Sequence, residues 1–248
     1  MVKKLSLVTG GAGFIGSNLV DFLVSKNHKV IVLDNFSTGR RSNLKKHKRS
    51  DVKIINVDIS TNKNLQKYFR NVKYVFHLAG LADIVPSVKD PVSYFNSNVL
   101  GTLNVLESSR KSNIKKFVYA ASASCYGLPK KFPVCEEDKI NPMYPYAFTK
   151  WQAEEMVMHW AKIYKLPAIS FRFFNAYGPR SRTTGAYGAV FGVFLAQKLA
   201  KKPLTIVGNG KQTRDFIHVK DLVKGLLAGA LSNKKFKIYN IGNGKEVT

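Results

Sequence analysis

Residues 5–16, LSLVTGGAGFIG, join a short apolar run to a series of closely spaced glycines. The apolar run predicts a strand, and the residues after the glycines have helical periodicity. Gly10, Gly13 and Gly16 have the spacing Gly-x-x-Gly-x-x-Gly, which permits a tight turn and close approach of backbone to a ligand. A helix that starts directly after such a turn points its N-terminus at a pyrophosphate. The segment therefore predicts a strand, turn and helix that bind a dinucleotide.

An acidic residue follows the next predicted strand. Residues 29–33, KVIVL, end at Asp34, which lies about twenty residues after the glycine turn, where a carboxylate accepts hydrogen bonds from the adenosine ribose. The same carboxylate repels a 2'-phosphate, so the sequence favours NAD over NADP. Arg40 and Arg41 follow closely and leave the choice open, as does the alternative that Asp34 is only a turn residue.

Strands and helices alternate along most of the chain. Further strands are expected at residues 52–57, 74–78, 117–121 and 168–173, and helices at 91–113 and 145–163. Such alternation predicts a parallel sheet covered on both faces, with ligands at the carboxyl ends of the strands. The predicted fold class is α/β, a Rossmann-type doubly wound parallel sheet with a smaller substrate-binding insertion at its carboxyl edge.

Residues 141–155, NPMYPYAFTKWQAEE, carry the candidate general base. Pro145 suits the first turn of a helix, and Tyr146 and Lys150 are four residues apart, so they share one helix face. An ammonium beside a phenol favours the phenolate and lowers the tyrosine pKa from its usual value of about 10. The pair is therefore suited to accept a proton from an alcohol, although it also occurs on solvated helices. Ser122 and Ser124 follow the fifth strand, either as ligand contacts or as turn residues.

The regular alternation of predicted strands and helices is interrupted at Asn175. We expect a loop at residues 175–188, a helix at 189–202 and a short strand at 204–208, followed by a strand, helix and strand that return to the sheet. The sequence therefore suggests an NAD-binding domain over residues 1–174 and a substrate-binding part over 175–248. Arginine pairs with phosphate in a bidentate way, so we expect three arginines of this part to hold a diphosphate. They are Arg180, Arg182 and Arg214.

The charge and composition of the chain limit the kinds of ligand and partner that it is expected to bind. The 40 Lys and Arg against 15 Asp and Glu give a net charge of +25, which attracts phosphates of any kind. The densest basic stretch, residues 40–49, contains no interleaved aromatic residue that could stack on bases, so a solvated surface is favoured over specific nucleic-acid binding. No apolar run is long enough for a membrane span, and Cys125 and Cys135 lack metal-ligand spacing. These features favour a cytoplasmic protein without a metal site.

Together, the motifs resemble those of extended short-chain dehydrogenase/reductases that modify nucleotide sugars, the NAD-dependent epimerase/dehydratase family. The motifs are TGGAGFIGS, LDNFSTG, FHLAG, SASCYG, PYAFTK, FRFFNAYGPR and GNGKQTRDFIHVKDL, in the family's order and approximate spacing. The resemblance covers essentially the whole chain and is strongest to the UDP-glucose 4-epimerase branch. It implies NAD as the cofactor and a UDP-sugar as the substrate.

The resemblance also implies residue roles. Tyr146 takes the proton from the sugar's 4-hydroxyl, Lys150 holds the nicotinamide ribose and lowers the tyrosine pKa, and Ser122 hydrogen-bonds the reacting oxygen. Hydride passes to NAD, leaving a 4-ketose that turns over before hydride returns to its other face. The implied cofactor contacts are Gly10, Gly13, Phe14, Ile15, Gly16, Asp34, Asn35, Asp58, Ile59, Leu78, Ala79, Gly80, Tyr146 and Lys150, with Asp58 and Ile59 flanking the adenine. The implied substrate contacts are Ser124, Asn175, Arg180 and Arg214.

Sister reactions and a different class of function remain alternatives. The 4,6-dehydratases carry an acidic pair directly after the hydroxyl residue, where this chain has Ala123 and Ser124, and decarboxylases usually have Glu at the second of these positions. Both reactions are therefore disfavoured by the resemblance. A basic RNA-binding or regulatory protein with an NAD fold would explain the charge, but it would not require Ser122, Tyr146 and Lys150.

The resemblance further implies a homodimer and a difference in length. Family members commonly pair the helices near 91–112 and 145–163 across a dimer. They also continue for several dozen residues beyond the end of this sequence, so the substrate-binding part is expected to be short at its C-terminus. Some of the wall that distinguishes glucose, N-acetylglucosamine and uronic acid lies in that stretch of the family.

Overall fold

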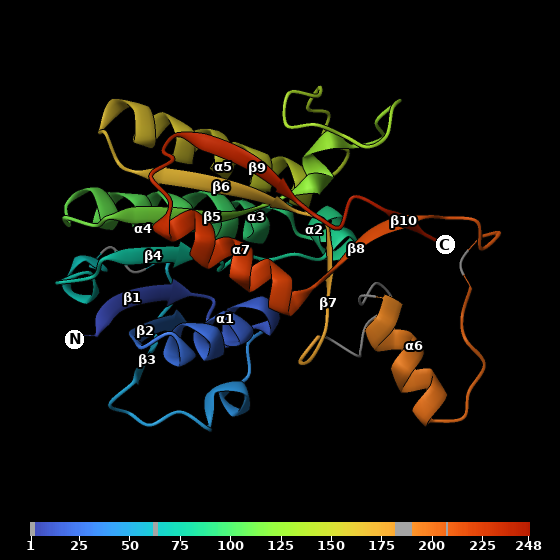
Figure 1. Ribbon diagram of the computed structural model, residues 1–248. Coiled ribbons are helices and arrows are strands. Elements are labelled where there is room, and N and C mark those ends of the chain that lie inside the picture. The colour runs from blue at the N-terminus through green and yellow to red at the C-terminus, as the bar shows by residue number, and fades with distance from the viewer. Residues whose placement is uncertain (1–2, 62–63, 182–189, 207) are drawn as a thin grey trace.

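The main body is a parallel sheet, and the computed structural model describes residues 3–61, 64–181, 190–206 and 208–248. Seven strands have the order β3-β2-β1-β4-β5-β6-β9, and every neighbouring pair is parallel (Figure 1). The strands are β1 Lys4–Thr9, β2 His28–Asp34, β3 Val52–Asn56, β4 Tyr74–His77, β5 Lys116–Ser122, β6 Ala168–Phe173 and β9 Lys237–Ile241. The predicted parallel α/β fold is confirmed.

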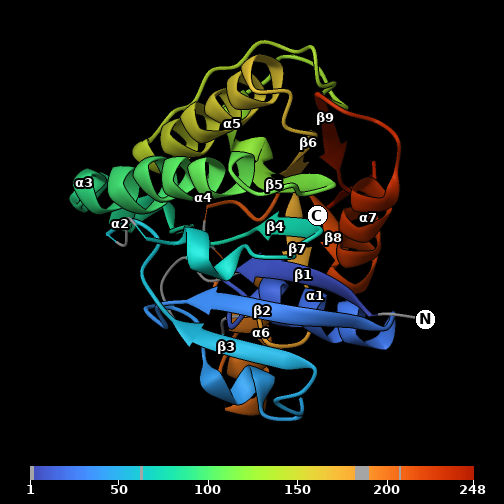
Figure 2. The same ribbon diagram turned by 90° about the vertical axis from the view of Figure 1, so that its left-hand side faces the viewer.

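Helices cover both faces of the sheet, as Figure 2 shows in side view. One face carries α1 Phe14–Ser25 and α7 Val219–Leu231, and the other carries α4 Gly101–Arg110 and α5 Pro145–Ile163. Each face has its own hydrophobic core. Leu19 and Leu226 belong to the first, and Leu106 and Val157 to the second; all four are fully buried. Because both faces are apolar, the strands read as nearly continuous hydrophobic runs.

The strand order fixes where a ligand can lie. The sheet runs from β1 to β2 and β3 in one direction and from β1 to β4, β5 and β6 in the other. Connections therefore leave β1 and β4 toward opposite faces and open a crevice at the carboxyl ends of these strands. This switch point is the usual ligand site of doubly wound sheets.

The single helix expected at residues 91–113 is present as a continuous helical stretch over residues 91–110, with one π-helical turn inside it. It consists of α3 Pro91–Phe95, one π-helical turn at Asn96–Leu100, and α4. A short helix that was not predicted, α2 Ile84–Lys89, precedes it. A π-helical turn inserts an extra residue into the helix and is common at functional sites. Here it turns Asn98 into the interior, where the side chain is 1% exposed.

The C-terminal part differs from the sequence prediction in two places. Asn175–Tyr177, expected as loop, forms β7, which pairs with β8 Arg214–His218 in a small sheet completed by β10 Glu246–Val247. The strand expected at 204–208 is not present at residues 204–206, which have no strand partner there, and Leu204 and Ile206 are exposed. An apolar pattern alone does not make a strand without a neighbour to pair with.

The small sheet and helix α6 Val190–Leu199 extend away from the main body, whereas α7 and β9 return to it (Figure 1). Helix α7 packs in the same core as α1, and β9 pairs with β6. Residues after 174 thus contribute both to the extension and to the main sheet. Arg182, one of the predicted diphosphate contacts, lies outside the described residues. Of the helices in the described ranges, none has both the length and the apolar character needed to cross a membrane.

Candidate cofactor and active site

The glycine turn lies at the carboxyl end of β1, where the backbone is too crowded for side chains. Gly10 has a positive φ of 67°, and its N–H donates to the Leu33 carbonyl at 2.8 Å. A Cβ on Gly16 would lie 2.1 Å from the Gly10 carbonyl oxygen. Only glycine fits where helix α1 crosses so close to the preceding turn. The turn therefore presents glycine backbone and a helix N-terminus to the cleft, as a pyrophosphate site requires.

A cleft of about 890 Å³ opens beside this turn at the switch point of the sheet. All the predicted cofactor residues line it: Gly10, Gly13, Phe14, Ile15, Gly16, Asp34, Asn35, Asp58, Ile59, Leu78, Ala79, Gly80, Tyr146 and Lys150. The cleft volume, and lining residues that come from the glycine turn, the end of β2, the loop after β4 and the start of α5, fit an extended dinucleotide. The cleft is also lined by residues that the sequence analysis did not select, namely Leu33, Ser37, Thr38, Asn43, Val57, Leu81, Ala82, Asp83, Ser97, Ala120, Ala121, Phe173, Ala176 and Ser181.

Asp34, the last residue of β2, is held in place by two backbone hydrogen bonds. The N–H of Ala12 donates to its Oδ2 and the N–H of Phe36 to its Oδ1, both at 2.8 Å. Each carboxylate oxygen retains a second lone pair, so the side chain can still accept hydrogen bonds from ribose hydroxyls. Arg40 lines the same cleft, while the guanidinium of Arg41 lies over the Phe36 ring at 4.1 Å.

Asn35 and Asp58 form the neighbouring wall. The Asn35 amide donates to Asp58 Oδ2 at 2.8 Å, and Ser60 donates to Oδ1 through its N–H at 2.8 Å and its hydroxyl at 2.6 Å. Burial alone would raise the pKa of Asp58, but these hydrogen bonds outweigh it and lower the pKa. The carboxylate is therefore charged and fixed where the resemblance places an adenine.

A buried hydrogen-bond chain supports the floor of the cleft. Thr9 Oγ1 bonds His77 Nδ1 at 2.7 Å, and His77 Nε2 bonds Thr102 Oγ1 at 2.8 Å. Thr9 Oγ1 also accepts from the N–H groups of Leu78 and Ala79. Burial and the nearby Lys150 charge lower the His77 pKa to about 3, so the imidazole is neutral. The motif FHLAG contained this histidine, but its role depends on threonines from two other elements.

Asn98 fixes the loop after β4. Its Oδ1 accepts from the Leu81 N–H at 2.8 Å, and its Nδ2 donates to the Leu81 carbonyl and to Thr149 Oγ1, both at 3.1 Å. A Cβ on Gly80 would lie 2.7 Å from Asn98 Oδ1, so glycine is required there. Asn98 thus ties this loop to the helix that carries Tyr146 and Lys150. The sequence contained no pattern that distinguished Asn98.

Tyr146 and Ser122 are brought together at the end of β5. The tyrosine hydroxyl is hydrogen-bonded to Ser122, whose Oγ also lies 2.8 Å from Ser124 Oγ. Burial raises the Tyr146 pKa to about 12, and the hydrogen bond to Ser122 only partly offsets this. The Tyr146 pKa is therefore raised in this structure rather than lowered as expected, because desolvation of the phenolate dominates.

Lys150 is buried beside the cleft. Its ammonium donates to the Ala120 carbonyl and lies 4.4 Å above the centre of the Tyr119 ring. Burial lowers its pKa to about 7, and the charge of Glu154 opposes that change. The lysine is thus engaged with the sheet rather than with the Tyr146 hydroxyl, and it faces the same cleft from the same helix.

The predicted diphosphate contacts do not share one environment. Arg180 lines the cofactor cleft, where its Nη2 lies 2.7 Å from Asp21 Oδ2 on α1. Arg214 is exposed on β8 and lowers the pKa of Tyr144 through its charge, although burial dominates and raises that pKa overall. Asn175 is also exposed and donates to the Asp215 carbonyl at 2.9 Å. Ser122, Ser124, Asn175 and Arg214 are not among the residues that line the cleft.

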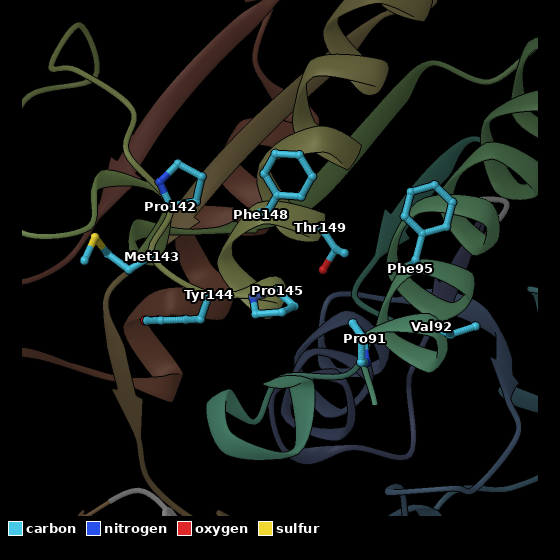
Figure 3. Close-up of a pocket in the computed structure, with 9 residues that line it drawn as sticks. All are labelled: Pro91, Val92, Phe95, Pro142, Met143, Tyr144, Pro145, Phe148 and Thr149. Atoms are coloured by element: carbon cyan, nitrogen blue, oxygen red, sulfur yellow. The ribbon is translucent and has the colours of Figure 1, made fainter. Parts of the chain in front are cut away.

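A second depression lies on the outer surface between α3 and the start of α5. Figure 3 shows Val92 and Phe95 on one side and Pro145 and Phe148 on the other. The groove measures about 520 Å³ and its walls are mainly apolar. Val92 is 67% exposed and Phe95 47% exposed, so this face leaves large apolar side chains in contact with solvent.

Comparisons with known proteins agree with this architecture. The family model described as "NAD dependent epimerase/dehydratase family" matches residues 6–242. A protein of Methanocaldococcus jannaschii named putative UDP-glucose 4-epimerase is 40% identical over 244 residues, which are 98% of this chain and 78% of that protein.

Solved structures give the same result. The UDP-N-acetylglucosamine 4-epimerase of Methanobrevibacter ruminantium, solved with UDP-N-acetylmuramic acid, has a TM-score of 0.96 at 35% identity and covers 100% of this chain and 79% of its own. The UDP-glucose 4-epimerase of Thermus thermophilus, solved with NAD, has a TM-score of 0.89 at 33% identity. The match covers 98% of this chain and 79% of that chain. The glycine turn, the acidic residue at the end of β2, the tyrosine and lysine that line the cleft, the serine bonded to that tyrosine and these matches lead to one conclusion: the chain belongs to the NAD-dependent epimerase/dehydratase family.

Proposed function

We propose that the protein interconverts the two 4-epimers of a UDP-sugar by transient oxidation at carbon 4. The observation that carries this proposal is the hydrogen-bonded Tyr146 and Ser122 at the edge of a dinucleotide cleft, with Lys150 on the same helix face. NAD is the cofactor, and bound in the cleft lined by the glycine turn, Asp34 and Lys150 it would supply the hydride acceptor and donor for carbon 4. The net reaction is therefore an isomerisation.

Tyr146 handles the proton in both directions. Its oxygen accepts the proton of the sugar's 4-hydroxyl as the carbon–hydrogen bond breaks, and it returns a proton as the alcohol re-forms. Ser122 donates to the reacting oxygen and keeps it within reach of the tyrosine. Because burial raises the Tyr146 pKa to about 12, the phenolate requires positive charge nearby.

Lys150 supplies that charge. Its pKa of about 7 leaves it substantially protonated at neutral pH, and its position on the cleft suits contact with the nicotinamide ribose. We infer that the ammonium exchanges its bond to the Ala120 carbonyl for contacts with ribose and with the approach to Tyr146. The role of the lysine is then to stabilise the phenolate and to orient the cofactor.

Residues of the small sheet and its surroundings hold the nucleotide-sugar. Asn175 and Arg214 are exposed, and the charge of Arg214 acts on Tyr144 directly before the helix that carries Tyr146. Both are suited to the diphosphate, since guanidinium binds phosphate strongly. Ser124 supports Ser122 through the contact between their hydroxyls. Arg180 is assigned instead to the cofactor end, because it lines the cleft and is paired with Asp21.

Proton NMR of the anomeric signals tests both the reaction and the sugar. UDP-glucose and UDP-N-acetylglucosamine are incubated separately with the protein and NAD. We expect the galacto epimer of at least one sugar without net formation of NADH. A product lighter by water or carbon dioxide, measured by mass spectrometry, would instead indicate a dehydratase or a decarboxylase.

We further propose a cytoplasmic homodimer. The groove between α3 and α5 exposes Val92, Phe95 and Phe148, and a second copy that pairs these helices would bury them. Both cysteines are free, which is consistent with a reducing compartment.

Analytical ultracentrifugation checks the dimer. Phe95→Lys should convert the protein to monomer, whereas Phe132→Lys should not, because Phe132 is 78% exposed on a different loop. A wild-type protein that sediments as a monomer at micromolar concentration would contradict the proposal.

A further inference from the structure

A fully buried ion pair lies behind the catalytic helix. Glu154 on α5 is 1% exposed and Arg172 on β6 is 3% exposed. The guanidinium donates twice to Glu154 Oε1, from Nε at 2.8 Å and from Nη2 at 2.7 Å. Ser170 Oγ donates to Oε2 at 2.6 Å. Both carboxylate oxygens are therefore fixed in place.

This pair is not explained by stability alone. Removing two charges from water costs several kcal/mol per ion, and buried pairs can often be replaced by neutral groups with little loss. Glu154 is four residues after Lys150, which places the two side chains on the same helix face. Both side chains are buried there between α5 and the sheet, with Lys150 bonded to the Ala120 carbonyl of β5 and Glu154 to Ser170 and Arg172 of β6.

The surroundings of Lys150 make this proximity important. Tyr119 on β5 lies under the ammonium and donates weakly from Oη to the Lys150 carbonyl at 3.4 Å. His77 on β4 is neutral, and Tyr146 is on the lysine's own helix. Arg172 on β6 is occupied by Glu154. Among these groups, Glu154 is the one whose negative charge acts on the ammonium.

We propose that Glu154 is a positioning residue for Lys150: its carboxylate, fixed by Arg172 and Ser170, keeps the lysine ammonium charged inside the protein. This inference rests on the proposed role of Lys150. Burial disfavours the charged form of Lys150, and the carboxylate opposes that effect. Without it, Lys150 becomes neutral at a lower pH and no longer stabilises the tyrosine phenolate.

The direct test is NMR titration of lysine side chains in protein labelled with ¹³C and ¹⁵N at lysine. The resonance that is lost in Lys150→Met is assigned to Lys150. In Glu154→Gln we expect Lys150 to titrate at least about one pH unit lower than in the wild type, as expected for loss of a close opposite charge. Glu154→Asp, which keeps the carboxylate, should lie closer to the wild type.

A double variant separates this role from simple pairing with Arg172. Glu154→Gln leaves a buried guanidinium without its partner, which is strongly destabilising. Glu154→Gln combined with Arg172→Gln removes both charges and allows the two amides to hydrogen-bond. We expect Lys150 in the double variant still to titrate at lower pH. A wild-type titration in the double variant would overturn the proposal.

Turnover gives an independent readout. We expect the alkaline limb of the kcat profile to move to lower pH in Glu154→Gln, with a rate loss of about tenfold at pH 8 and a smaller loss at pH 6. Ser170→Ala is the matched control, because it removes one hydrogen bond to the carboxylate and leaves its charge. If the wild type turns over no UDP-sugar, the proposed function fails, while the NMR titration still decides the role of Glu154.

Discussion

The cofactor cleft and the small sheet beside it are built differently. In the cleft, Asp34 and Lys150 are each 7% exposed, and backbone groups hold both side chains. In the small sheet, Asn175 and Arg214 are exposed, and of the residues of α6 only Gly192 is buried. The cofactor cleft is thus fixed by the sheet, whereas the proposed substrate contacts lie on an extension with little core of its own.

This difference has a functional meaning. A dinucleotide site that is preformed loses little conformational entropy on binding, so cofactor affinity should depend on backbone shape. Exposed arginines and asparagines lose side-chain entropy only when they meet the substrate. Changes in the first region should therefore affect folding and NAD binding, and changes in the second should affect the Michaelis constant for the sugar.

The largest effect is expected for Tyr146→Phe. Loss of the hydroxyl removes the group that exchanges the proton, so kcat should fall by about 10²–10⁴-fold. NAD binding, measured by calorimetry, should be retained because the glycine turn is unchanged. Tyr144→Phe is the control, since its ring stacks parallel to Tyr146 at 6.4 Å but it is not the proposed base. Turnover that survives in Tyr146→Phe would remove this residue from the mechanism.

Gly16→Ala tests the rigidity of the first region. Its Cβ would lie 2.1 Å from the Gly10 carbonyl oxygen, so the turn must move. We expect a loss of about 2–3 kcal/mol in the free energy of unfolding, together with weaker NAD binding. Gly244→Ala in the second region has nothing within 4 Å of the added Cβ and should cost only about 1 kcal/mol for its positive φ. Equal losses in denaturant unfolding would contradict the contrast between the two regions.

Two arginines sharpen the comparison at the level of binding. Arg214→Ala should raise the Michaelis constant for the UDP-sugar about tenfold without changing the melting temperature, because it removes a charge-assisted contact made only with substrate. Arg180→Ala should instead lower the melting temperature, with a stability loss of about 1 kcal/mol, since its guanidinium is paired with Asp21. If the two variants exchanged these behaviours, our assignment of the arginines would be reversed.

The smallest effect is expected at Asp21, whose carboxylate contacts the side chains of Lys46, His47 and Arg180. Burial alone would raise the Asp21 pKa, but the hydrogen bonds outweigh it and lower the pKa below 3.8. A lowered folded pKa contributes stability above the unfolded pKa, and this is lost as pH falls through the folded value. Asp21→Asn should therefore cost about 1 kcal/mol at pH 7, and the difference should disappear as the pH falls through the lowered folded pKa of Asp21. Asp221→Asn is the control, because Asp221 forms its ion pair with Lys224 on the exposed face of α7 and its replacement should cost less. A stability difference for Asp21→Asn that persists in acid would argue against the ion pairs.

Much of the first region could be predicted because its signals are local. The glycine turn must be glycine for steric reasons, and the spacing of Tyr146 and Lys150 follows from the helix period. The second region gave weaker predictions. Residues 204–206 have the apolar pattern of a strand but pair with no other strand that the structure describes. Asn175–Tyr177 have the composition of a loop but form a strand, because β8 pairs with them.

The sequence by itself determined the parallel α/β fold, the dinucleotide turn and the helix that carries the tyrosine and lysine, because each follows from residues close together in the chain. Only the tertiary structure decided which charges meet. Arg180 and Asp21 are 159 positions apart and form a pair, and Glu154 on α5 pairs with Arg172 on β6. Burial of the Tyr146 phenol in the folded protein raises its pKa, whereas the spacing to Lys150 alone predicted a lower value. Ionisation depends on desolvation and on distant neighbours, and neither can be read from spacing alone.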